Sequence, residues 1–144
     1  MSVSKVSKVN EIMYQYGVSD LDKVALISRA DEGLLSNSFF DLAEVSGIKR
    51  EELAGFLNIS LKTLLRYSKE KKRLNSINSE QILKIFSLYH KGEEVFGGIE
   101  TFNKWLRKPA YGLGDRIPYE LLTTISGIEL IYNELAAIEY GDFS

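Results

Sequence analysis

Residues 50–69 read REELAGFLNISLKTLLRYSK, which is the pattern of two short helices joined by a tight turn. A helix-turn-helix needs a small residue where its helices cross, and Ala54 occupies that position. Asn58 suits the turn because asparagine tolerates a left-handed backbone, and Ser60 can cap the second helix through its side-chain oxygen. The positions that would form the shared core are apolar: Leu53, Leu57, Ile59, Leu64 and Tyr67. The stretch therefore predicts a helix-turn-helix.

The second helix of this motif would project hydroxyl and cationic side chains outward, and three more cations follow it. Such groups reach base edges and phosphates when a helix enters the major groove of DNA. The candidate DNA-binding residues are Ser60, Lys62, Thr63, Arg66, Lys69, Lys71, Lys72 and Arg73. Leu61 and Leu65 fit either contacts with thymine methyl groups or packing on a neighbouring element. A surface helix pair that binds no DNA is the alternative.

Charge is distributed unevenly around this motif. Residues 46–75 carry 8 basic and 3 acidic groups, whereas residues 1–45 carry 4 and 7, and residues 92–144 carry 4 and 9. A basic segment between acidic flanks is typical of a short element that binds a polyanion, although charges on solvated helix faces also cluster by chance.

The rest of the chain also reads as helix, so we predict an all-α fold. Apolar residues recur at helical spacing over 3–16, 21–32, 36–47, 99–106 and 128–138, and no long segment alternates with period two. Two capping-box patterns predict further helix starts, at Asn78–Gln81 and at Ser126–Glu129. Gly92 is the predicted end of the helix that follows the first box. A cluster of glycines at 92–98 predicts a boundary between a domain over 1–91 and a domain over 92–144.

Composition excludes several classes of protein. The chain has 144 residues, no cysteine and a single histidine, so it can form neither a disulfide framework nor a zinc site of clustered cysteine or histidine. No apolar run approaches the roughly 18 residues that span a bilayer, and the first residues lack a secretory signal, so we expect a cytoplasmic protein. No nucleophile–base set or phosphate-binding loop can be assembled. We expect no enzyme activity, no cofactor and no metal.

The last third of the chain resembles a known domain. Its landmarks are Phe96-Gly97, Trp105-Leu106, Pro109, Leu113-Gly114, Pro118, Leu121-Leu122, Thr124, Gly127, Leu135, Ile138 and Gly141. In this order and spacing they resemble the toxin-binding domain of the Xre/MbcA/ParS antitoxins, in which an Xre-like helix-turn-helix precedes that domain. The resemblance covers roughly residues 36–144, and residues 1–35 match poorly. Asp115 stands where this family commonly has a second glycine.

The resemblance implies an antitoxin that binds a RES-domain toxin, a protein that consumes nicotinamide dinucleotide, and blocks its substrate access. It also implies a homodimer that binds operator DNA and represses its own operon. We expect the toxin-binding residues among Leu113, Gly114, Asp115, Arg116, Glu134, Glu139, Tyr140 and Asp142. The acidic residues of the last helix fit two interpretations, a solvated face or a surface that meets a cationic phosphate pocket of the toxin.

Two other functions are compatible with the sequence. The chain would be a stand-alone dimeric transcriptional regulator if its last third served only in dimerisation or sensing. It would be a protein-binding adaptor if its helix pair contacted no DNA.

Overall fold

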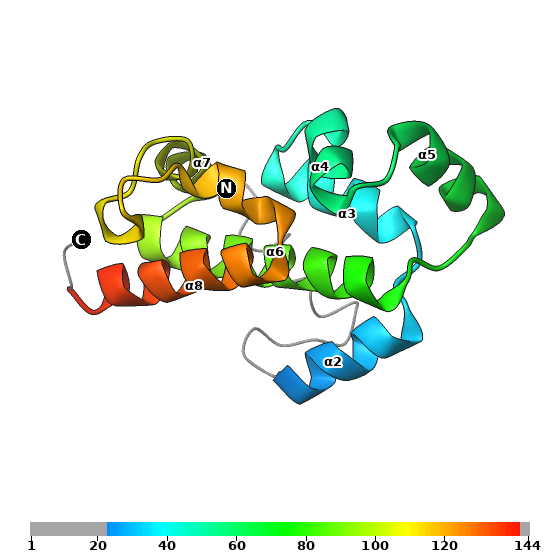
Figure 1. Ribbon diagram of the computed structural model, residues 1–144, viewed down its shortest axis with the longest axis horizontal. Helices are drawn as coiled ribbons and strands as arrows, with labels where there is room; N and C mark the ends of the chain where they lie inside the picture. The colour runs from blue at the N-terminus through cyan, green and yellow to red at the C-terminus, as the bar shows by residue number, and fades with distance from the viewer. Residues whose placement is uncertain (1–22, 142–144) are drawn as a thin grey trace, which may run out of the picture.

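The computed structural model describes residues 23–141, and every regular element in this range is helical (Figure 1). The predicted all-α fold is confirmed. The helix expected over residues 3–16 lies outside the described residues. The elements are α2 (Lys23–Glu32), α3 (Asn37–Ser46), α4 (Arg50–Leu57), α5 (Leu61–Glu70), α6 (Ser76–Phe96), α7 (Ile99–Leu106), η1 (Tyr111–Leu113), η2 (Pro118–Thr123) and α8 (Ile125–Glu139).

The 21-residue α6 is the central element of the fold. Its buried residues include Ile82, Leu83, Ile85, Phe86 and Leu88, which point in several directions, and a helix that is apolar around much of its surface must be enclosed. Helices α2, α3, α7 and α8 all pack against it. In Figure 1, α2 lies below α6 and α3, α4, α5 and α7 lie above it.

Helix α8 runs parallel to α6. Lys84 pairs with Glu129 at 2.7 Å. Further toward the C-terminal ends of both helices, Lys91 pairs with Glu139. The hydrogen bond to Glu139 raises the pKa of Lys91. These pairs lie at the rim of an apolar contact formed by the buried face of α8, which comprises Ile128, Ile131 and Leu135.

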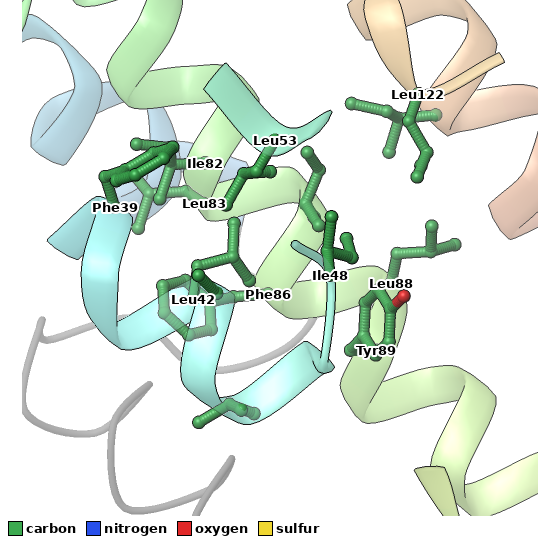
Figure 2. Packing of buried hydrophobic residues seen from close by; sticks show 14 of the residues in the cluster. Phe39, Leu42, Ile48, Leu53, Ile82, Leu83, Phe86, Leu88, Tyr89 and Leu122 are labelled. Atoms are coloured by element: carbon green, nitrogen blue, oxygen red, sulfur yellow. The ribbon is translucent and has the colours of Figure 1, made fainter. Parts of the chain in front are cut away.

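The core extends without a break through the described part of the chain. Leu53 of α4, Leu88 of α6 and Leu122 of η2 belong to the same cluster of buried residues, and each is 0% exposed (Figure 2). The predicted boundary at residues 91 and 92 lies within α6, which continues to Phe96. The division into two domains stays a prediction.

Helix α6 differs from its predicted limits at both ends. It begins at Ser76 because the side chain of Asn75 accepts a hydrogen bond from the backbone N–H of Asn78 at 2.7 Å, so the capping box predicted at Asn78–Gln81 is wrong. It does not stop at Gly92. Gly97 ends it, with φ at 80° and its N–H donating to the carbonyl of Glu93.

The start of α8 is also two residues earlier than predicted. Thr124 caps this helix by accepting a hydrogen bond from the N–H of Gly127 at 2.9 Å, so the capping box predicted at Ser126–Glu129 is wrong. Pro118 occupies the first turn of η2, where its fixed φ suits a helix start.

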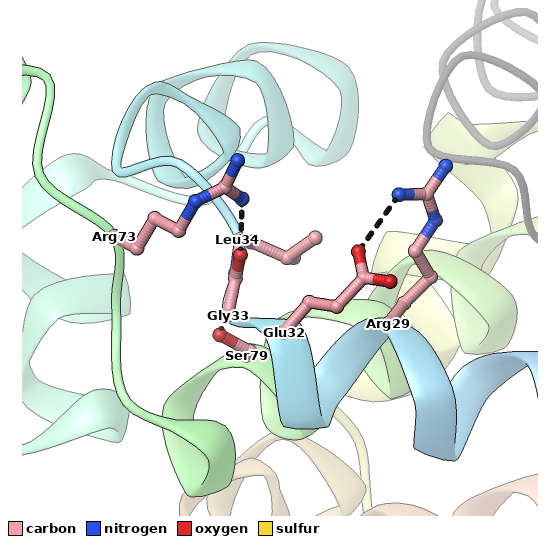
Figure 3. A network of polar contacts seen from close by, with 6 residues as sticks. All are labelled: Arg29, Glu32, Gly33, Leu34, Arg73 and Ser79. Carbon is pink, nitrogen blue, oxygen red and sulfur yellow. Dashed lines mark hydrogen bonds and ion pairs between the residues drawn. The ribbon is translucent and has the colours of Figure 1, made fainter.

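The segment after α2 and the segment after α5 lie side by side in an extended conformation and are hydrogen-bonded through their backbones. Leu35 and Arg73 form an isolated antiparallel bridge, and the N–H of Leu34 donates to the hydroxyl of Ser79 at 2.9 Å (Figure 3). Gly33 has a φ of 85°, and a Cβ at this position would lie 2.6 Å from the carbonyl oxygen of Leu74. Only glycine fits this crossing.

Candidate functional site

The helix-turn-helix forms as the sequence predicts. Asn58 lies in the left-handed region with φ at 58°, and Ala54 is buried at the crossing of α4 and α5. The Ser60 hydroxyl accepts a hydrogen bond from the N–H of Thr63 at 3.1 Å and caps α5. Leu53, Leu57 and Leu64 are fully buried, while Ile59 and Tyr67 are partly buried against them.

The carbonyl groups at the end of α4 receive hydrogen bonds from α6. The Asn78 side chain donates to the carbonyl of Leu57 at 3.0 Å. The Gln81 side chain donates to the carbonyl of Phe56 at 2.8 Å and also to that of Leu122 at 3.1 Å. A helix end leaves such carbonyls without intrahelical partners, so these two amides hold α4 on the central helix.

Helix α5 presents a cationic outer face. Lys62, Arg66 and Lys69 are exposed at successive turns, and with Leu65 they line an open hollow on that face. Leu61 and Leu65 of α5 have different environments. Leu61 packs against the core, whereas Leu65 is 47% exposed among the cations.

The remaining predicted DNA-binding residues have mixed environments. The Ser60 hydroxyl donates to the Thr63 hydroxyl at 2.8 Å, so both side chains already serve the cap. Lys71 is exposed at the C-cap of α5 with φ at 54°. Lys72 lies 3.5 Å from Glu70 and 5.1 Å from the ring of Tyr67.

Arg73 has a structural contact that the sequence did not indicate. Its guanidinium donates to the carbonyl of Gly33 at 2.6 Å and ties the end of α2 to the segment after α5 (Figure 3). Because the acceptor is a backbone carbonyl 40 residues away, no local pattern could have predicted this role.

Part of the predicted toxin-binding set lies where η1 packs on α8. The backbone folds back through a bridge between Ala110 and Arg116, and Gly112 lies directly against the carboxylate of Glu134. Leu113 packs on the core, and Asp115 has a φ of 62° beside Gly114 at 65°. Aspartate therefore adopts the left-handed conformation at the position where the family commonly has glycine.

The acidic residues of α8 do not share one environment. Glu134 is 8% exposed and belongs to the packing of η1 on α8 rather than to a solvated face. Glu139 is exposed and paired with Lys91, and Tyr140 is 84% exposed. Asp142 lies outside the described residues.

Sequence reasoning missed two exposed apolar residues of the same region. Tyr111, in η1, is 76% exposed, and Leu130, on α8, is 52% exposed. Exposed aromatic side chains are typical anchors of protein interfaces. The signal available in the sequence was an aromatic residue, Tyr111, next to Gly112 in the segment between Pro109 and Pro118.

Glu93 has a perturbed carboxyl group. It is 3% exposed, its Oε1 has no hydrogen-bond partner, and it follows Gly92 on the buried side of α6. Burial, together with the neighbouring charge of Glu94, raises the pKa of Glu93 to about 7.

The described residues contain no group of three His, Asp or Glu side chains arranged to hold a metal ion. Nor do they include a helix long and apolar enough to cross a membrane.

Comparisons with known proteins agree with this layout. A model of the antitoxin Xre-like helix-turn-helix domain matches residues 25–87, and a model of the antitoxin Xre/MbcA/ParS C-terminal toxin-binding domain matches residues 91–141. A curated protein of Sphingobium sp. (strain YBL2) named "Prs ADP-ribosylating antitoxin" is 23% identical over 138 residues, which cover 90% of this chain and 85% of that protein. The resemblance predicted from the sequence is confirmed. The chain belongs to the Xre/MbcA/ParS antitoxins, and it is an antitoxin of a toxin–antitoxin system.

Proposed function

We propose that this antitoxin binds and inhibits a RES-domain toxin that consumes NAD, and that it represses its own operon through the helix-turn-helix. The observation that carries the proposal is the succession, in one chain, of a helix-turn-helix with a cationic outer face and a matched toxin-binding domain. The relative's name refers to ADP-ribosylation, a reaction that takes ADP-ribose from NAD. Such an antitoxin acts in the cytoplasm, where its operon lies.

The proposal assigns residues 1–91 to DNA and residues 92–144 to the toxin. It also includes a homodimer, because helix-turn-helix proteins commonly read two half-sites about one helical turn apart. The toxin-binding surface comprises the loop at Leu113–Arg116, the end of α8 at Glu139–Tyr140, and the exposed Tyr111. Figure 1 shows the η1 segment above the C-terminal end of α8, so a partner that covers one would reach the other.

Replacing Tyr111 and Tyr140 together with alanine will release the toxin. Both rings are largely exposed, so their loss costs the fold little, whereas buried interface aromatics contribute about 2 kcal/mol or more each to binding. We expect at least a 30-fold weaker complex, measured with the purified product of the neighbouring RES-domain gene, and loss of growth protection on co-expression.

The matched control is Ile77→Ala, which truncates a side chain that is 67% exposed at the start of α6. A double tyrosine variant that still binds and protects as well as wild type would move the toxin-binding surface elsewhere. A wild-type chain that neither copurifies with the toxin nor protects cells would favour a stand-alone regulator.

Replacing Lys62 and Arg66 with alanine will weaken binding to the operator and leave toxin neutralisation intact. Each lost phosphate contact lowers the salt dependence of binding, the slope of log K against log[salt], by about one unit. Titration of the duplex upstream of the gene at several salt concentrations measures both affinity and slope. If the double variant binds this duplex as tightly as wild type, α5 is not the helix that contacts DNA.

A further inference from the structure

Three of the four basic residues of the C-terminal third lie within five positions at the end of α7. Lys104, Arg107 and Lys108, here called the α7 basic patch, are all exposed. No ion pair engages them within residues 23–141, whereas Lys84 and Lys91 of α6 are both paired with acids of α8. Cations that have no acidic partner and cluster on an otherwise acidic domain favour an anionic partner.

Contacts on both sides of the patch place it beside the helix-turn-helix. The Asn103 side chain donates to the carbonyl of Ser46 at 2.8 Å and accepts from the hydroxyl of Tyr89 at 2.7 Å. This fixes α7 against the end of α3, immediately before Lys49 and Arg50, which are exposed at the start of α4.

The other side of the patch is attached to α4 through Tyr119. The guanidinium of Arg107 lies 4.0 Å from the centre of the Tyr119 ring, and the Tyr119 hydroxyl donates to Glu52 of α4. The same ring packs edge-on against Phe56 at 5.1 Å. Burial, and then the hydrogen bond to Glu52, raises the pKa of Tyr119 to about 12, so the hydroxyl remains a donor.

Exposed cations are thus carried by α5, by the start of α4 and by the end of α7. Figure 1 shows α5, α4 and α7 on the same side of α6. In helix-turn-helix proteins the second helix enters the major groove while the first helix crosses the phosphate backbone. A duplex read by α5 therefore passes its backbone near α4, the helix to which the α7 basic patch is attached.

We propose that the α7 basic patch binds phosphates of the DNA duplex that α5 contacts, so that the toxin-binding domain itself contributes to operator affinity. This proposal rests on the proposed DNA-binding function. DNA is favoured over the toxin as the partner of this patch because the toxin surface proposed above ends in acidic residues of α8. A partner that attracts those acids would repel the patch.

The test neutralises Lys104 and Lys108 by glutamine and retains Arg107, because Arg107 stacks on Tyr119. The probe is the duplex upstream of the gene, with a scrambled duplex of the same composition as reference. We expect the magnitude of the salt slope to fall by about 1 to 2 units per chain and the affinity to fall about tenfold, with the preference for the operator unchanged. The matched control is Lys84→Gln with Lys91→Gln, which removes the same charge from the side of α6 that faces α8.

The outcomes distinguish a failure of the proposed DNA-binding function from a failure of the role proposed for the α7 basic patch. A wild-type chain that does not prefer its operator over the scrambled duplex overturns the proposed DNA-binding function and this inference with it. If wild type binds and the Lys62–Arg66 variant loses slope, but the Lys104–Lys108 variant keeps the wild-type slope, the inference alone is wrong. If the Lys84–Lys91 control loses as much salt slope as the Lys104–Lys108 variant, the effect comes from net charge and the inference is wrong. The inference is also wrong if the Lys104–Lys108 variant loses toxin binding while its salt slope is unchanged.

Discussion

Replacing Phe102 with alanine will lower the free energy of unfolding by about 3–5 kcal/mol, the usual cost of removing a fully buried phenylalanine. Its ring is 0% exposed, packs edge-on against Tyr89 at 5.0 Å between ring centres, and stacks on Trp105 at 6.1 Å. The ring also lies directly on Gly92, where a Cβ would overlap it. Because the ring fills the contact between α7 and α6, its removal leaves a cavity between these helices.

The same change will reduce DNA binding, although α5 is more than 30 residues away in sequence. The core is continuous, and a loss of this size is a large part of the 5–15 kcal/mol that stabilises a typical domain. Denaturant unfolding followed by circular dichroism measures the stability, and Thr101→Ala, on the exposed side of α7, is the control. Separate unfolding of the C-terminal half, with the helix-turn-helix still folded, would contradict the effect on DNA binding and support two independent domains.

Replacing Glu93 with glutamine will stabilise the protein by about 3 kcal/mol at pH 8 and leave its stability nearly unchanged at pH 4. Burial raises the pKa of Glu93 from 4.5 to about 7. Below pH 4.5 the carboxyl group is protonated in both the folded and the unfolded chain. As the pH rises toward 7 the unfolded chain ionises first, so stability is lost until the folded state ionises as well.

The magnitude follows from the free energy of about 1.4 kcal/mol that corresponds to each pKa unit, and at pH 4 the protonated carboxyl group and the glutamine amide are both neutral. Denaturant midpoints of wild type and variant, measured from pH 4 to pH 8, give the difference. Glu100→Gln, which removes an exposed acid from α7, is the control. The same gain at pH 4 as at pH 8 would show that the effect does not come from ionisation.

The helix-turn-helix was predictable because its determinants are local. Ala54 at the crossing, Asn58 in the turn and Ser60 at the cap each act within about four residues, and all three have the expected structure. The resemblance of the last third to a toxin-binding domain was equally a matter of sequence, since it depends on the order and spacing of residues such as Trp105 and Pro118.

What the sequence could not determine was which partner a polar or small residue has. Asn78 and Gln81 fit a capping box, but their amides donate to carbonyls of α4 and η2, which are 21 and 25 or more residues away. The sequence predicted that Gly92 ends a helix, but this residue lies within α6. A glycine fits there because the ring of Phe102 fills the space that a side chain would need.

By itself, then, the sequence determined the helical fold class, the helix-turn-helix and the family, because these depend on periodicity, capping and motif order along the chain. Only the tertiary structure decided where α6 begins and ends, that Arg73 holds Gly33, and that Glu134 lies against Gly112. It also placed the α7 basic patch beside α4. These features depend on contacts between distant segments, and a buried hydrogen bond or a close approach of two helices is chosen by packing, after the helices have formed.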